Sequence, residues 1–337
     1  MAHYTSAMLA ALAEGFPADE WLAFVPRGPG SIEAARGAAP AAAVDVVRHR
    51  LPSRALFGSA ALLGRPRLDR LVGGCDVVWI PAPAPVAVSR GTPYVLTVHD
   101  LSWLDRPQDF TRYERAWHRL GRLERLATEA RAIVAVSHAT RRAIERHWPS
   151  VRHVEVVHSG IPPLPDPGPR PPWLPPRYFL AVGALEPRKA PEVLARAFAK
   201  ARETGLDAEL VFAGRGRLSD AVRGPGVHVV EDADGATLAA LYTHALALAL
   251  PSHAEGFAFT ALEAARAGTP VLASEALEVL DETLPGATLK VRDWPEALLR
   301  IAADDDLRER LAETARAQAA RLSWSEAAKR LRDVLAR

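Results

Sequence analysis

Two glutamates, Glu255 and Glu263, lie eight residues apart in a stretch of small and apolar residues, PSHAEGFAFTALEAARAGTPVLAS. The stretch begins and ends next to apolar runs that are short enough to be buried strands. Between these runs the apolar spacing predicts a helix from Phe257 to Arg266, which Gly268 would cap and Pro270 would stop. Eight helical residues rise about 12 Å, so the two carboxylates are too far apart to share a proton or a metal ion. They could instead each bind one end of a single long polar ligand.

The backbone at the start of this expected helix is suited to an anion. Gly256, Phe257 and Ala258 would present the unpaired N–H groups of a helix start, which favour a phosphate. Gly256 also allows close approach because it has no side chain. The alternative is that Glu255 is only a favourable charge at a helix N-terminus and that Glu263 is a solvated helix residue. Spacing alone leaves both interpretations open.

Two cations follow an earlier expected strand, Tyr178–Val182, in the phrase GALEPRKAPEVLARAF. Gly183 permits a tight exit from the strand, Arg188 and Lys189 come next, and Pro191 opens a helix where proline is best tolerated. Open α/β sheets bind ligands at the carboxyl ends of their strands. The two cations are therefore candidates for binding an anionic ligand, and a solvated basic loop is the alternative.

Polar residues also end three expected strands in the first half of the chain. His99 and Asp100 follow the apolar run at 94–98, and His99 is a candidate for contacting a ligand there. A hydrogen-bonded turn is the alternative for the His-Asp pair. Ser137 with His138, and the tripeptide at 158–160, end the next two strands, and we expect them only to line the same ligand site.

These side chains need parallel strands to bring them to one edge, and apolar runs do alternate with helical patterns along the chain. The expected strands are 21–25, 44–48, 76–80, 94–98, 132–136, 154–157, 178–182, 209–213, 227–230, 245–250 and 271–273. The expected helices include 4–14, 111–130, 140–147, 257–266 and 323–335. This alternation predicts an α/β chain of βαβ units with parallel sheets flanked by helices.

Nine prolines within the fifteen residues 162–176 exclude both a helix and a central strand there, so this segment is expected to be a linker. It separates a first domain at 1–161 from a second domain at 177–322. The last segment, 323–337, has Ser323 as a candidate N-cap and an apolar stripe on one face. A length of 337 residues is comfortable for two domains.

The stretch EGFAFTALEAARAGTPV resembles the donor-site signature of retaining glycosyltransferases of family GT4, and LEPRK is a recurrent phrase of the same family. The resemblance is close at 178–274 and loose elsewhere. It implies the GT-B fold: two Rossmann-like domains that face each other across a cleft, with the nucleotide-sugar donor on the second domain and the acceptor on the first. It also implies that the C-terminal helix returns to the first domain.

The same resemblance implies roles for individual residues. Glu255, with the amides that follow it, would hold the sugar of the donor, and Glu263 would accept hydrogen bonds from the nucleotide ribose. Lys189, with Arg188 as a substitute, would neutralise the diphosphate, and His99 would reach the transferred sugar or a phosphate. One position departs from the family pattern, because many relatives carry an arginine directly after Gly183 and this chain has Ala184.

The reaction implied is transfer of a sugar, with retention at the anomeric carbon, to a glycan, a lipid-linked or a small-molecule acceptor. No side chain stands out as a covalent nucleophile and no cluster of histidines and cysteines indicates a metal site, so we expect a metal-independent front-face mechanism without a cofactor. The family's first strand and Gly-rich loop precede HYTSAMLAALAE, and neither is present here. We expect a start codon upstream of the one assigned. The alternative is a degenerate protein that binds a nucleotide sugar or a partner without turnover.

Composition and charge limit the partners and the cellular compartment to expect. The formal charge of +2 gives no reason to expect a nucleic-acid partner, and the single cysteine, Cys75, fits a reducing compartment. No apolar stretch approaches the length of a membrane span, so we expect a cytoplasmic protein. The segment from Arg112 to Arg131 reads as a basic amphipathic helix, which suits either peripheral contact with an anionic membrane or packing on a sheet with arginines in water.

Overall fold

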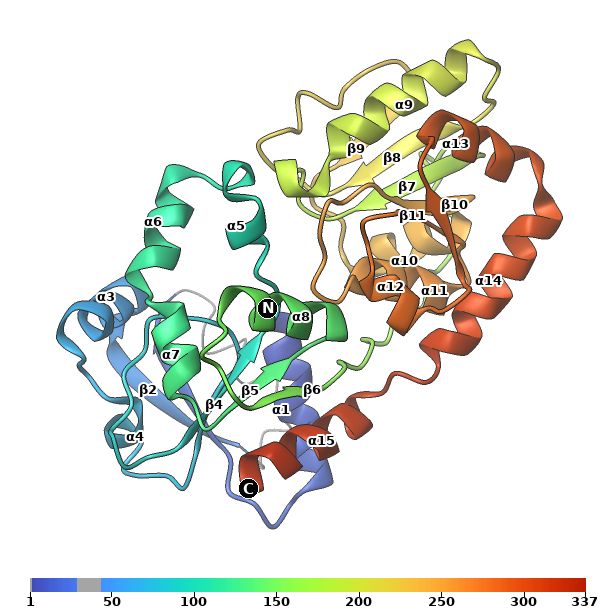
Figure 1. Cartoon of the computed structure of the whole chain (residues 1–337). Helices are drawn as coiled ribbons and strands as arrows, with labels where there is room; N and C mark the ends of the chain where they lie inside the picture. Colours follow the sequence, from blue (N-terminus) through green and yellow to red (C-terminus); the bar gives the residue numbers. More distant parts are fainter. Residues whose placement is uncertain (1, 29–43) are drawn as a thin grey trace. The chain divides into compact units, whose positions relative to one another are not determined.

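The computed structural model describes residues 2–28 and 44–337 as an α/β protein (Figure 1). Its contacts divide the chain into two compact units, unit 1 with residues 1–160 and 322–337, and unit 2 with residues 161–321. Every strand pair in both units is parallel. The expected class, parallel sheets flanked by helices in two Rossmann-like halves, is confirmed.

Unit 2 contains one six-stranded sheet in the order β12-β11-β10-β7-β8-β9. Its strands are β7 (Tyr178–Val182), β8 (Glu209–Ala213), β9 (Val227–Val230), β10 (Ala247–Leu250), β11 (Val271–Ser274) and β12 (Thr288–Val291). Its helices are α9 (Pro191–Glu203), α10 (Gly235–His244), α11 (Phe259–Ala267), α12 (Val279–Thr283), α13 (Trp294–Ala303) and α14 (Asp305–Ala319). The chain builds outward from β7 in one direction and then from β10 in the other. The switch point therefore lies between β7 and β10.

The central strands of unit 2 are buried on both faces, which explains their continuous apolar sequences. All four residues of β10 are buried, and Phe179 on β7 and Phe212 on β8 pack with Phe198 of α9 in one core. The linker expected at 162–176 belongs to this unit, and Leu174 within it is buried. The outer strand β12 was not expected, because its sequence TLKV alternates polar and apolar residues over only four positions.

Unit 1 contains two separate sheets. Strands β3 (Val78–Ile80), β4 (Tyr94–Val98), β5 (Ala132–Ala135) and β6 (Val154–Val156) form a four-stranded sheet in that order. Among the residues that the structure describes, β1 (Leu22–Arg27) pairs only with β2 (Asp45–Pro52). The helices are α1 (Ala2–Gly15), α3 (Ser53–Leu63), α4 (Leu68–Leu71), α5 (Ser102–Asp105), α6 (Arg112–Leu120), α7 (Leu123–Glu129) and α8 (His138–His147). Strand β4 is buried throughout, whereas β1 and β3 are only partly buried.

The C-terminal helix α15 (Trp324–Ala336) packs within unit 1 against α1, as expected for a helix that returns to the first domain. Ser323 caps it by accepting a hydrogen bond from the amide of Glu326 at 3.2 Å. At its other end the Arg131 guanidinium donates to the carbonyl of Val334 at 3.2 Å. The buried face of the helix, which includes Leu331, packs within unit 1. Both helix ends are therefore tied down.

The prediction of a single basic helix at 111–130 is wrong. The segment forms two helices, α6 and α7, because Gly121 ends the first and Arg122 adopts a left-handed conformation with φ 45°. Thr111 and Glu114 form a reciprocal capping box at the start of α6. Among residues 2–28 and 44–337, no helix is both long and apolar enough to cross a membrane.

Candidate active site

The loops that follow β7 and β10 meet at the switch point of the sheet of unit 2. The Lys189 ammonium forms an ion pair with Oε1 of Glu255, and the two side chains are only 18% and 8% exposed. The amide of His253 also donates to the carbonyl of Arg188 at 3.0 Å, which joins the two loops through their backbones. The fold thus brings together a cation and a carboxylate that are 66 residues apart in sequence.

Ser252 completes this cluster and was not anticipated. Its hydroxyl is fully buried and donates to the same oxygen of Glu255 at 2.7 Å. With two donors on Oε1 the carboxylate is held in one orientation, and within the described part of the chain no residue donates to Oε2. The only sequence signal for Ser252 is its position directly after the strand and three residues before Glu255.

The backbone around Gly183 is shaped for close approach. Gly183 has φ 130°, and a side chain there would meet no atom within 4 Å. Gly214, at the end of β8, packs so closely that its Cβ would lie 2.1 Å from the Gly183 carbonyl oxygen. A cavity of about 20 Å³ lies beside this turn, lined by residues that include Lys189 and Ser252, and it is large enough for one water molecule.

The helix that carries Glu263 begins two residues later than expected. Ala258 is left-handed with φ 57° and acts as the N-cap, so α11 starts at Phe259. Gly256, Phe257 and Ala258 consequently form the turn before the helix rather than its first turn. Ala190 has the same conformation at the start of α9, with φ 49°, directly after Lys189. Alanine in this conformation costs about 1–2 kcal/mol, and such strain concentrates at functional sites.

Glu263 is held by a neighbouring helix and is not a freely solvated residue. The hydroxyl of Tyr242, on α10, donates to Oε2 of Glu263 at 2.8 Å. Tyr242 is fully buried, and burial together with the adjacent carboxylate raises its pKa well above the usual value. The phenol therefore stays protonated and remains a donor.

Arg188 and Ala184 complete the description of this edge of unit 2. No hydrogen bond or ion pair of the Arg188 guanidinium is found among the described residues, so its charge is not neutralised internally. The side chain of Ala184 is exposed. Nearby, Arg217 forms an ion pair with Glu186, which fixes the loop that leads to Lys189.

His99 lies at the end of β4 in unit 1 and is mostly buried. Its Nε2 lies 2.9 Å from the carbonyl oxygen of Pro81, and because a carbonyl only accepts, Nε2 carries the proton. The ring of Tyr4 meets it edge to face at a centroid distance of 4.6 Å. Burial lowers the pKa of His99, so the ring is neutral and Nδ1 is left as a hydrogen-bond acceptor. Asp100 accepts from the amide of Ser102 at 2.9 Å and forms the turn that we gave as its alternative role.

The residues that end β5 and β6 are largely structural. Ser137 caps α8 by accepting from the amide of Thr140 at 3.0 Å, while the rings of His138 and His158 lie 5.9 Å apart. A Cβ on Gly160 would lie 2.2 Å from the amide nitrogen of Trp324, so only glycine lets α15 begin where it does.

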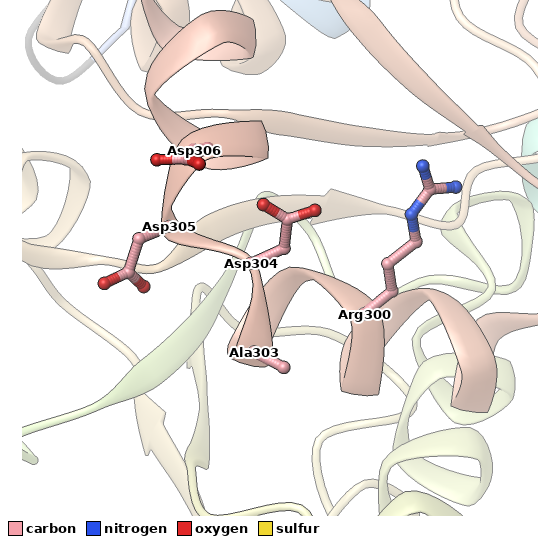
Figure 2. Close-up of a pocket in the computed structure, with 5 residues that line it drawn as sticks. All are labelled: Arg300, Ala303, Asp304, Asp305 and Asp306. Atoms are coloured by element: carbon pink, nitrogen blue, oxygen red, sulfur yellow. The ribbon is translucent and has the colours of Figure 1, made fainter.

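A hollow of about 570 Å³ at the junction of α13 and α14 contains none of the expected site residues. Figure 2 shows its three consecutive aspartates pointing in different directions from the helix start. Asp304 accepts from the amide of Leu307 at 2.8 Å and is the N-cap of α14. These aspartates therefore serve the helix.

Comparison with known proteins assigns each half of the chain. Residues 6–163 match the family described as Glycosyltransferase Family 4, and residues 176–304 match the family described as Glycosyl transferases group 1. A D-inositol 3-phosphate glycosyltransferase from Actinosynnema mirum is 37% identical over 166 residues, which cover 42% of this chain and 40% of the relative. That alignment spans less than half of the relative's length.

Two further proteins match over more of the chain. A D-inositol 3-phosphate glycosyltransferase from Salinispora arenicola is 28% identical over 340 residues, which cover 86% of this chain and 74% of the relative. The solved structure of sucrose-phosphate synthase from Thermosynechococcus elongatus aligns with a TM-score of 0.65 at 18% identity, covering 94% of this chain and 98% of that one. At that identity the structural likeness shows the fold, GT-B. From its two matched halves and this fold, the chain belongs to the group 1, family 4 glycosyltransferases.

Proposed function

We propose that this protein transfers a sugar from a nucleotide-sugar donor to an acceptor hydroxyl, with retention of configuration at the anomeric carbon. The observation that carries the proposal is the cluster of Lys189, Glu255 and Ser252 at the switch point of the sheet of unit 2. Ligands of open α/β sheets bind at such points. A cation and a carboxylate held there match the two needs of the donor, a charged diphosphate and a hydroxyl-rich sugar.

Each end of the donor has a partner in this arrangement. Lys189 and the internally unpaired Arg188 neutralise the diphosphate, so the charge on the leaving group is balanced by protein cations without a metal ion. Glu255 accepts hydrogen bonds from sugar hydroxyls, and Gly256, Phe257 and Ala258 offer the backbone of the turn before α11. Glu263 accepts from the ribose, and the open space at Gly183 admits the phosphates.

Retention follows from a front-face reaction. The bond between the anomeric carbon and the diphosphate oxygen breaks, and the acceptor oxygen bonds to the same face of that carbon. The acceptor proton passes to the departing phosphate oxygen, and Lys189 stabilises the negative charge that builds there. Glu255 has a binding role in this proposal: Lys189 and Ser252 hold its Oε1, and its Oε2 accepts from the sugar hydroxyls.

Unit 1 supplies the acceptor side. His99, neutral and with Nδ1 as an acceptor, receives a hydrogen bond from a hydroxyl of the transferred sugar. The acceptor belongs to the class of glycans, lipid-linked glycans or small polyols, and the relatives named for D-inositol 3-phosphate make a phosphorylated polyol the first compound to test. Contact of α6 with an anionic membrane stays a prediction for the lipid-linked case.

A panel of nucleotide sugars tests the proposal. A ligand that binds only the folded state raises the melting temperature by an amount that grows with its concentration relative to its Kd, so one donor in the panel should give a clear rise. That donor, incubated with polyol phosphates and glycans, should yield a product whose anomeric configuration by NMR equals that of the donor. A panel without any stabilising nucleotide sugar, or a product with inverted configuration, would contradict the proposal.

The exposed Ala184 favours a second candidate, a protein that binds a nucleotide sugar without turnover. Many relatives carry a cation at this position, and its loss weakens stabilisation of the leaving diphosphate. Binding with neither transfer nor slow hydrolysis of the donor would select this candidate. Activity gained in Ala184→Arg would locate the defect.

A further inference from the structure

Tyr242 connects the last turn of α10 to Glu263, the ribose-binding glutamate of the proposed function. Its side chain is fully buried, and its hydroxyl makes one hydrogen bond, to Oε2 of Glu263 at 2.8 Å. A hydroxyl donor to a carboxylate is a strong, charge-assisted partner. Glu263 itself is only half-buried, so one of its oxygens is anchored in the interior while the carboxyl group reaches the surface of α11.

The backbone of Tyr242 is fixed as well. Thr269, in the turn that follows α11, is buried and donates from its hydroxyl to the Tyr242 carbonyl at 2.6 Å. The last turn of α10 is thereby bonded to the turn that ends the helix of Glu263. The phenol and the carboxylate are held from both sides, and neither helix can rotate without breaking a buried hydrogen bond.

We propose that Tyr242 is a positioning residue that orients Glu263 for the paired 2′- and 3′-hydroxyls of a ribose. The selectivity of the proposed site for ribose over 2′-deoxyribose then depends on Tyr242. This inference rests on the proposed function and adds to it a buried residue that positions the ribose-binding carboxylate.

The selectivity has a direct physical basis. A carboxylate whose plane is fixed accepts from two vicinal hydroxyls at once, whereas a freely rotating one must first be ordered at an entropic cost. A 2′-deoxy ligand leaves part of the oriented carboxylate without a donor in a half-buried site. Sites built to hydrogen-bond a hydroxyl reject the analogue that lacks it for this reason.

Isothermal titration calorimetry with UDP, GDP and ADP, each beside its 2′-deoxy counterpart, tests the inference on the full chain. The wild-type protein should bind the preferred ribonucleotide roughly tenfold or more tightly than its 2′-deoxy form. In Tyr242→Phe the ribonucleotide should bind roughly tenfold more weakly, while the 2′-deoxy form changes little. The preference therefore falls to about threefold or less.

The chain offers a matched control in Tyr178. This tyrosine is also fully buried in unit 2, and its hydroxyl donates to the Leu241 carbonyl at 2.7 Å, not to a glutamate. Tyr178→Phe removes a buried hydroxyl of the same kind and should lower the melting temperature without changing the ribose preference. Glu263→Gln keeps the side-chain shape and should lose the preference even if Tyr242→Phe does not fold.

The outcomes separate the two levels of the argument. Absence of binding by every nucleoside diphosphate would overturn the proposed function and this inference with it. Binding with equal affinity for ribo and 2′-deoxy forms would overturn the inference and leave the function standing. A preserved preference in Tyr242→Phe, or an equal loss in Tyr178→Phe, would overturn the role of Tyr242.

Discussion

The two units hold their candidate residues by different means. In unit 2, charged side chains bind each other: Lys189 pairs with Glu255, and Glu263 is held by a buried phenol. In unit 1, His99 is neutral and is held by a backbone carbonyl and the ring of Tyr4. The sheets of the two units also differ. Unit 2 has one six-stranded sheet, whereas the described strands of unit 1 form two separate sheets.

In the proposed reaction this difference divides the roles: unit 2 binds the donor and stabilises its leaving group, and unit 1 contributes to the transfer step. In unit 2 the ion pair with Glu255 fixes the position of the Lys189 ammonium, which can form charge-assisted hydrogen bonds with a diphosphate. A neutral imidazole adds little to phosphate binding but can accept a hydrogen bond from a hydroxyl without competing with water. Substitutions in unit 2 should therefore act on donor binding and leaving-group stabilisation, and those in unit 1 on transfer alone.

The largest effect is expected at Lys189. In Lys189→Ala the leaving diphosphate loses its cation and Glu255 loses its partner, so initial transfer rates should fall about 10³-fold or more, with weaker binding of the nucleoside diphosphate. Lys200→Ala, which truncates an exposed lysine on α9, is the control and should leave both unchanged. Retention of more than about a tenth of wild-type activity in Lys189→Ala would remove the charged cluster from the mechanism.

His99→Ala should lower transfer about 10²-fold while the affinity for the nucleoside diphosphate stays within about twofold of wild type. The reason is that His99 belongs to unit 1 and contacts the sugar, not the diphosphate, in the proposed reaction. Initial rates at saturating donor, beside calorimetry with the nucleoside diphosphate, measure the two quantities. The exposed His153→Ala serves as control. Equal losses of binding and transfer would show that the two units are not divided in this way.

Substitution of two glycines, Gly160 in unit 1 and Gly183 in unit 2, tests the comparison by its effects on stability and on nucleotide affinity. In Gly160→Ala the new Cβ meets backbone of Trp324 at 2.2 Å, so α15 must shift and the free energy of unfolding should fall by about 2 kcal/mol or more, with nucleotide affinity retained. In Gly183→Ala no atom lies within 4 Å, but φ 130° strains an alanine by about 1–2 kcal/mol. That methyl enters the space left for the phosphates, so nucleotide affinity should fall. Urea denaturation and calorimetry distinguish the two, and the reverse pattern would contradict both assignments.

The parts of the fold that could be predicted from sequence are short strands rich in apolar residues. The bounds of β4, β7, β8 and β9 agree with the runs that predict them, although β9 is an outer strand that is only partly buried. The start of α11 could not be predicted, because an alanine at 258 in a left-handed conformation has the same sequence signal as an alanine in a helix. The break after α6 was hidden for the same reason at Arg122.

The site was predictable as a set of residues but not as a set of contacts. The signature around Glu255 and the phrase around Lys189 predict their roles separately, and their pairing depends on β7 lying beside β10, which no local pattern states. Tyr242 lies in an apolar helix and reads as a core residue, because the partner of its hydroxyl is on another helix. The roles of all these residues stay predictions that the variants above test.

The smallest expected effect is the dependence of stability on pH, and it also distinguishes the units. Burial lowers the pKa of His99 below 6.5, so below that pH the unfolded chain takes up a proton that the folded chain refuses. Stability is then complete above pH 6.5 and falls as the pH drops toward the folded pKa. Burial lowers the pKa of His118 and His244 too, so part of the slope has other origins.

His99→Phe keeps a buried ring against Tyr4 but has no titrating group. Its melting temperature between pH 7.5 and 5 should therefore fall less steeply than that of the wild type, while the exposed His153→Phe follows the wild-type curve. The carboxylate of Asp100 opposes this shift, because it favours the protonated ring. An unchanged slope in His99→Phe would mean that the imidazole is as readily protonated in the folded chain as in water. The contrast between a neutral histidine in unit 1 and a charged cluster in unit 2 would then be wrong.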